Sequence, residues 1–87
     1  MNDSIIVERP RRIEIPKRGR DICAALDRCD YLKSRQTGDH RTYLDERDGE
    51  RFTVLNTRND LEDSNPKVWH RLRKKLIGKY GEIFEAR

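Results

Sequence analysis

An Asp-Gly turn between two alternating runs is the feature that most constrains the fold of this chain. Residues 40–45 and 50–55 both alternate polar side chains with aromatic or aliphatic ones, and Asp48-Gly49 lies between them. Period-two alternation is typical of a strand with one buried face, and Asp-Gly is a preferred hairpin turn. These residues therefore predict an antiparallel hairpin. Its first strand presents two sets of side chains on opposite faces: His40, Thr42 and Leu44 on one, and Arg41 and Tyr43 on the other.

A further strand is expected over residues 31–36, because this half-polar run ends at Thr37-Gly38-Asp39. Glycine readily adopts the positive φ that a tight turn requires, so we expect Gly38 to shape the turn into the next strand. Residues 31–55 together predict a three-stranded antiparallel meander.

Two amphipathic helices flank this predicted sheet. Apolar residues recur at helical spacing in residues 19–30, and Asn65-Pro66 is an N-cap followed by proline at the first helical position, with Gly78 as the expected end. The apolar stripes are Ile22, Ala25, Leu26 and Cys29 in the first helix, and Val68, Trp69, Leu72, Leu76 and Ile77 in the second. We predict a small α+β domain of order α-β-β-β-α, with both helices on one face of the three-stranded sheet and the other face in water.

The 87 residues fit one domain, and its core must be thin, because 41% of the residues are charged and only 33% are hydrophobic. We expect a basic N-terminal arm over residues 1–18 and the α-β-β-β-α domain over residues 19–78. Within the domain, residues 56–64 read as a polar loop anchored by Leu61. A short C-terminal tail is expected over residues 79–87.

The sequence contains no apolar run of roughly 18 residues and no signal-peptide pattern at its start. We therefore expect no membrane association and a cytoplasmic location. Cys23 and Cys29 are six positions apart on the first predicted helix, about 240° around its axis, which does not suit a disulfide. We expect both cysteines to act as small apolar residues in a reducing compartment.

Positive charge is concentrated near the C-terminus. The net charge is only +4, but residues 67–87 hold seven Lys/Arg against two Asp/Glu, a local charge of +5, whereas residues 46–66 carry −3. Arg71, Lys74 and Lys75 on the second predicted helix are therefore candidate contacts to nucleic-acid phosphates. The alternative is a solvated helix face whose cations complement the helix dipole.

The residues available for catalysis are few. The glycines are scattered, which excludes a phosphate-binding P-loop, and neither histidine lies near a cysteine at ligand spacing, so no metal ion or other cofactor is expected. His40 follows the predicted turn and has Arg35 and Arg41 nearby. Histidine transfers protons near neutral pH and guanidinium groups hold phosphate, which together suffice for metal-free RNA cleavage by the ribose 2′-OH. The alternative is a surface histidine without a role; His70 is expected to be dispensable.

Three segments, taken in order, resemble the HicA family of toxin–antitoxin mRNA interferases. They are Arg-Asp-Ile-Cys-Ala-Ala-Leu at 20–26, Arg-Gln-Thr-Gly-Asp-His at 35–40 and Asp-Gly-Glu-Arg-Phe-Thr-Val at 48–54. The resemblance covers about residues 20–77 and implies a double-stranded-RNA-binding-like fold, translation-independent cleavage of mRNA and neutralisation by an antitoxin protein. It also implies His40 as the catalytic residue and Gly38 as the turn glycine. Asp39 replaces the serine usual in the family, and Asn56 lies where many members have a proline and a second histidine.

Three functions are consistent with these features. The first is a metal-independent endoribonuclease in which His40 is the general acid or base and Arg35 and Arg41 bind phosphate. The second is a non-catalytic binder of structured RNA or DNA that uses the basic second helix. The third is a protein-interaction module, of phage or mobile-element origin, whose exposed sheet edge pairs with a strand of its partner.

Overall fold

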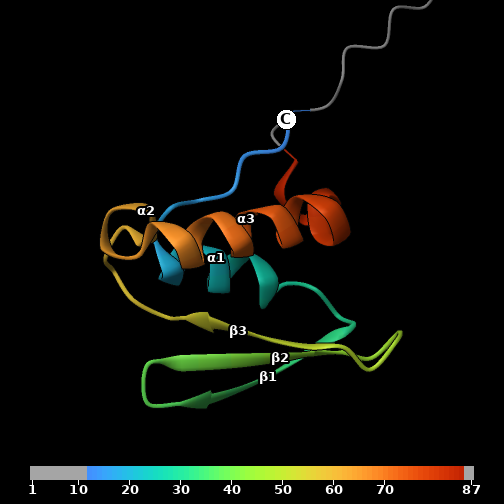
Figure 1. Ribbon diagram of the computed structural model, residues 1–87. Helices are drawn as coiled ribbons and strands as arrows, with labels where there is room; N and C mark the ends of the chain where they lie inside the picture. Colours follow the sequence, from blue (N-terminus) through green and yellow to red (C-terminus); the bar gives the residue numbers. More distant parts are fainter. Residues whose placement is uncertain (1–11, 86–87) are drawn as a thin grey trace, which may run out of the picture.

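The computed structural model describes residues 12–85 and confirms the predicted α+β arrangement (Figure 1). The strands form one antiparallel sheet of order β1-β2-β3, with the helices on one side of it. Residues 1–11 of the predicted arm lie outside the described residues. The elements are α1 (Gly19–Leu26), β1 (Leu32–Thr37), β2 (His40–Asp45), β3 (Arg51–Leu55), α2 (Leu61–Ser64), α3 (Pro66–Tyr80) and the 3-10 helix η1 (Gly81–Phe84).

The core fills the space between the helices and the inner face of the sheet. Five residues of the predicted apolar stripes are buried: Ile22, Leu26, Trp69, Leu72 and Leu76. Val68, which belongs to the second predicted stripe, is 47% exposed. The sheet contributes aromatic rings. Phe52 stacks on Tyr43 with a centroid separation of 5.4 Å and lies 5.2 Å from the ring of Tyr80. A few large side chains therefore replace the many aliphatic residues of a larger domain.

Two predicted helix ends and one predicted loop differ from the structure. α1 ends at Leu26 instead of residue 30, since the chain turns at Asp27 to enter the sheet. The predicted loop contains α2, whose N-cap Asp60 accepts hydrogen bonds from two backbone N–H groups. α3 continues past Gly78 to the buried Tyr80, whose contacts outweigh a glycine penalty of about 1 kcal/mol.

The packed unit extends on both sides of residues 19–78. Residues 12–18 run along the helices on the side away from the sheet (Figure 1), and Ile15 belongs to the core. The backbone N–H of Glu14 donates to Phe84 at 3.2 Å, and Phe84 of the C-terminal segment is buried. The two segments that flank the domain in sequence thus cover the same side of it.

Gly19 permits the close approach of α1 to the end of β3. A Cβ atom at this position would lie 1.7 Å from the carbonyl oxygen of Leu55. The next residue, Arg20, donates its backbone N–H to the carbonyl of Thr57 at 2.8 Å. The start of α1 is therefore held directly against the backbone that leaves β3.

A buried carboxylate joins the β2–β3 hairpin to α3. Asp45 is 0% exposed and accepts hydrogen bonds from the backbone and guanidinium of Arg47 and from the hydroxyl of Tyr80 at 2.9 Å. Lys79 lies 3.5 Å from the same carboxylate and also pairs with Asp48 and Glu50. The Arg47 side chain, followed by Tyr80, holds the pKa of Asp45 well below its ordinary value, so the ionised form is part of the fold.

This carboxylate makes the stability of the fold sensitive to acid. Because the pKa of Asp45 is lower in the folded state, its stabilisation is present at neutral pH and lost as the pH falls from about 5 towards 2. We expect Asp45→Asn to be less stable at pH 7 and to show a weaker loss of stability over that range, measured by urea unfolding at several pH values. Asp39→Asn is the control, because the Asp39 side chain makes no ion pair within residues 12–85. Equal acid sensitivity of Asp45→Asn and the wild type would contradict this account.

Candidate nucleic-acid interface

The open face of the sheet, which points away from the helices, carries nine side chains in three rows. Directly paired residues of neighbouring strands share a face, so the strand register defines these rows. From β1 through β2 to β3 they are Lys33–Leu44–Arg51, Arg35–Thr42–Thr53 and Thr37–His40–Leu55. None of the nine is acidic, and four are basic or histidine, so the open face is a positively charged surface.

A hollow of about 420 Å³ lies on this face between β1 and β2, and it reaches Arg51 on β3. Lys33, Arg35 and Arg51 line it together with threonine side chains and Leu44. Lys33 has one distant ion pair, 3.8 Å from Glu46, whereas Arg35 and Arg51 make no side-chain hydrogen bond or ion pair within residues 12–85. Two guanidinium groups are therefore available to an anion, and guanidinium binds phosphate well.

His40 lies at the end of this face, in the first position of β2, and is exposed as predicted. Gly38 has a φ of +58°, which confirms its expected role in the turn. The turn is held from two sides: the Gln36 side chain donates to the carbonyl of Gly38, and the backbone N–H of Asn56 donates to that of Asp39 at 2.7 Å. His40 is a diagonal neighbour of Arg35, a separation that long side chains span.

Arg41 lies on the opposite face from His40. Its guanidinium donates to both carboxylate oxygens of Asp27 at 2.9 and 3.2 Å, and also to Gln36 at 3.3 Å. Tyr43, on the same face, donates to Asp27 at 2.9 Å, and burial raises the pKa of this phenol well above its ordinary value. The structure thus does not bring the Arg41 side chain together with Arg35 and His40, and phosphate binding by Arg41 stays a prediction. Arg41 instead fastens β2 to the C-terminal end of α1.

The three cations predicted on α3 do not form one patch. Lys75 pairs with Glu50 on the hairpin, and its ammonium lies 5.6 Å from the centre of the Phe52 ring. Arg71 and Lys74 are exposed and unpaired within the described part of the chain, on the helical side of the molecule. His70 is exposed on the same helix. The nucleic-acid contact predicted for these residues stays a prediction, and it would use a different side from His40.

Sequence analysis missed Lys33 and Arg51. Both belong to the row that crosses the sheet at Leu44, directly across from it on the neighbouring strands. The Asp48-Gly49 turn could have indicated on which face of the sheet Arg51 lies. Once this turn fixes the hairpin register, the alternation of β3 places Arg51 on the same face as Leu44 and His40.

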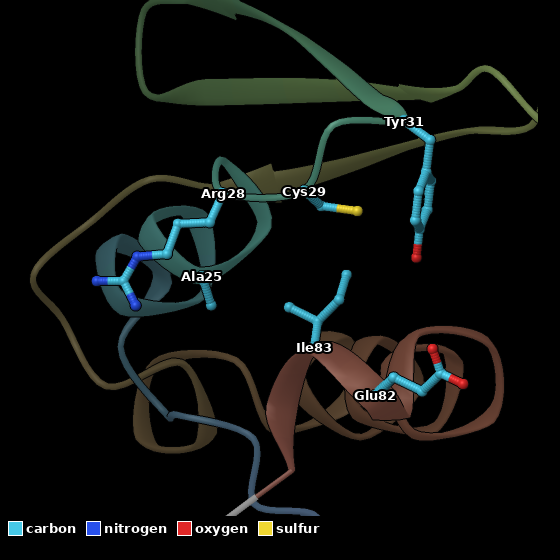
Figure 2. A pocket seen from close by; sticks show the side chains of 6 residues that line it. All are labelled: Ala25, Arg28, Cys29, Tyr31, Glu82 and Ile83. Carbon is cyan, nitrogen blue, oxygen red and sulfur yellow. The ribbon is translucent and has the colours of Figure 1, made fainter.

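A second pocket, of about 300 Å³, lies between the end of α1 and η1 (Figure 2). The Cys29 thiol, Ile83 and the Tyr31 ring surround its centre, whereas the Arg28 guanidinium points away from it. Neither histidine lines it, so no imidazole is placed there to activate the thiol. Cys23 is buried, and burial raises the pKa of its thiol. The two cysteines are both free, and their expected role as small apolar residues fits these positions.

No three His, Cys, Asp or Glu side chains gather as a metal site in the part of the chain described. Over the same residues, no helix has the length and apolar character needed to cross a bilayer. Comparisons with protein-family models, curated proteins and solved structures found no match. The open face of the sheet is thus the candidate interface on geometry and charge alone.

The pairing of Arg41 with Asp27 can be tested by a double-mutant cycle. We expect Arg41→Ala and Asp27→Ala each to lower the free energy of unfolding, with a coupling of roughly 1 kcal/mol for this partly exposed two-bond pair. Urea unfolding of the two single variants and the double variant measures it. Strictly additive losses would show that Arg41 is not held by Asp27 and could turn to the open face.

Proposed function

We propose that this protein binds RNA through the open face of its sheet and cleaves the bound strand without a metal ion, with His40 as the proton-transfer group. The observation that carries the proposal is the positive charge of Arg35 and Arg51, which have no ion pair among residues 12–85. They lie around a hollow whose neighbouring row contains the exposed His40. Phosphate groups of a single strand would lie along the hollow. The resemblance to HicA toxins supports the same activity, with mRNA as the target, an antitoxin as a protein partner and the cytoplasm as the location.

The proposed cleavage uses the RNA's own 2′-OH. The His40 imidazole takes the proton of this hydroxyl, and the 2′ oxygen forms a bond to the adjacent phosphorus while the bond to the 5′ oxygen breaks. The leaving 5′ oxygen takes a proton from water or from the imidazolium. Arg35 stabilises the negative charge on the phosphoryl oxygens as it grows. The products are a 2′,3′-cyclic phosphate and a 5′-hydroxyl, and DNA is left intact because it lacks the 2′-OH.

A non-catalytic RNA-binding role is the second candidate, and one observation favours it. His40 is the only side chain on the nine open-face positions that is suited to proton transfer near neutral pH. Asn56, at the position where the HicA pattern often has a second histidine, cannot transfer a proton. Its side chain donates to Gln36 at 3.3 Å. In this second candidate function, the same surface binds RNA but does not cleave it.

Cleavage and binding assays on the same RNA test the proposal. We expect the wild type to produce cyclic-phosphate ends with chelator present, and His40→Ala to bind RNA but lose cleavage. Arg35→Ala and Arg51→Ala should each weaken binding and reduce the slope of log affinity against log salt by about 0.7, the contribution of one phosphate on a single strand. The matched control is Lys74→Ala, which removes an unpaired cation from the helical side and should leave binding unchanged.

The outcomes separate the two candidates. Binding that depends on Arg35 and Arg51 without any cleavage would establish the non-catalytic role. Cleavage by His40→Ala, or cleavage that requires magnesium, would contradict the catalytic proposal. An equal loss of affinity in Lys74→Ala and Arg35→Ala would move the interface to α3.

A further inference from the structure

A groove separate from the open-face hollow runs between α3 and the edge strand β3. It has a volume of about 200 Å³ and is lined by Phe52, Thr53, Val68, Arg71, Leu72 and Lys75. Val68 is 47% exposed, although it belongs to the apolar stripe of α3. Its neighbours Phe52 and Leu72 belong to the core, so the groove extends the core's apolar surface to the solvent.

The outer edge of β3 has free backbone groups beside this groove. Among the described residues, β3 pairs with β2 alone and is therefore an edge strand. Asp45 donates its N–H to Glu50 at 2.8 Å, and Asn56 donates its N–H to Asp39 at 2.7 Å, in the same register. Because bonded and non-bonded pairs alternate in an antiparallel ladder, the N–H and C=O groups of Arg51 and Thr53 point outwards. No backbone group of residues 12–85 forms a hydrogen bond with these two N–H and two C=O groups.

The charge around this edge is positive. Arg51 projects from β3 onto the open face, and Arg71 lines the groove; neither has an ion pair within the described residues. Lys75 also lines the groove, and its partner Glu50 lies outside the lining. No lining residue is acidic. An occupant with acidic side chains on the open face, beside Arg51, is therefore favoured.

We infer that the β3 edge and this groove form a docking site for an extended, acidic segment of a partner protein that adds a fourth strand to the sheet. Alternate side chains of such a segment point to opposite faces. One set is apolar and packs on Val68, Leu72 and Phe52; the other is acidic and lies beside Arg51 on the open face. A second copy of this chain is a poorer occupant, because it would bring Arg51 and Arg71 of two chains together. RNA is also a poorer occupant, because it has few apolar groups to pack on Val68, Leu72 and Phe52.

This docking site goes beyond the proposed RNA-binding function and needs no RNA for its test. The probe is a fluorescein-labelled peptide of alternating valine and glutamate. We expect it to bind the full chain in anisotropy measurements and to protect the backbone N–H groups of Arg51 and Thr53 from hydrogen exchange. A peptide N-methylated at alternate positions, which cannot complete the strand pairing, should bind about tenfold more weakly with no change to the protein.

Two protein variants locate the contact. Thr53→Pro removes an outward N–H from an edge strand, where proline is tolerated, and should weaken peptide binding about tenfold in a protein whose thermal melt shows a folded state. Val68→Glu should weaken it to a similar degree by placing a carboxylate in the groove, whereas its matched control Val68→Thr, which has the same shape, should bind nearly as the wild type. RNA binding should be unaffected by either change at Val68. A failure of the docking site is therefore distinguishable from a failure of the proposed RNA-binding function.

Several results would overturn the inference. Binding of the N-methylated peptide as tight as that of the parent peptide would show that strand pairing is not involved. Protection of the Thr53 N–H by an oligoribonucleotide would make the edge an RNA contact. A dimer of the chain alone, with the same N–H protected, would make it a self-association edge.

Discussion

Successive side chains of β2 point to opposite faces of the sheet, and most of the structure depends on which side chains of this central strand lie on each face. Its odd-numbered side chains, from Arg41 to Asp45, reach the helical side and are buried or largely covered. Its even-numbered side chains, from His40 to Leu44, stay on the open face. A shift of the register by one residue would exchange the two sets, and would place a histidine in the core and a buried carboxylate in water. The ion pairs of Asp27 and Asp45 therefore favour the same register as the apolar packing does.

The two faces of the sheet also differ in whether their positively charged side chains have carboxylate partners. On the helical side, Arg41, Arg47 and Lys79 each have a carboxylate partner. The pairs of Arg41 with Asp27 and of Lys79 with Glu50 attach α1 and α3 to the sheet, whereas the pair of Arg47 with Asp45 lies within the hairpin. On the open face, Arg35 and Arg51 have none within residues 12–85. A paired cation contributes to the fold, and an unpaired one is available to a ligand. The net charge of the chain is only +4, yet within the described residues Arg35 and Arg51 leave positive charge on the open face without a carboxylate partner.

Local signals in the sequence were enough to predict the elements that depend on local geometry. Asp48-Gly49 fixed the hairpin, since Gly49 has a φ of +78°, and the apolar spacing identified the buried faces of α1 and α3. The continuation of α3 past Gly78 was not predictable in this way, because it depends on Tyr80 reaching Asp45, which is 35 residues away in sequence. The partner of Arg41 could not be predicted from the sequence for the same reason. Asp27 lies 14 residues before it, and only the packing of α1 on the sheet brings the two together.

The most direct test of this account is a backbone amide chemical-shift titration of the full chain with a short single-stranded RNA whose 2′ positions are methylated, so that it cannot be cleaved. The central claim is that RNA lies on the open face of the sheet. It predicts shifts centred on Lys33, Arg35, His40 and Arg51, with little change at Arg71 and Lys74. Shifts centred on Arg71 and Lys74, with the open face unchanged, would contradict it.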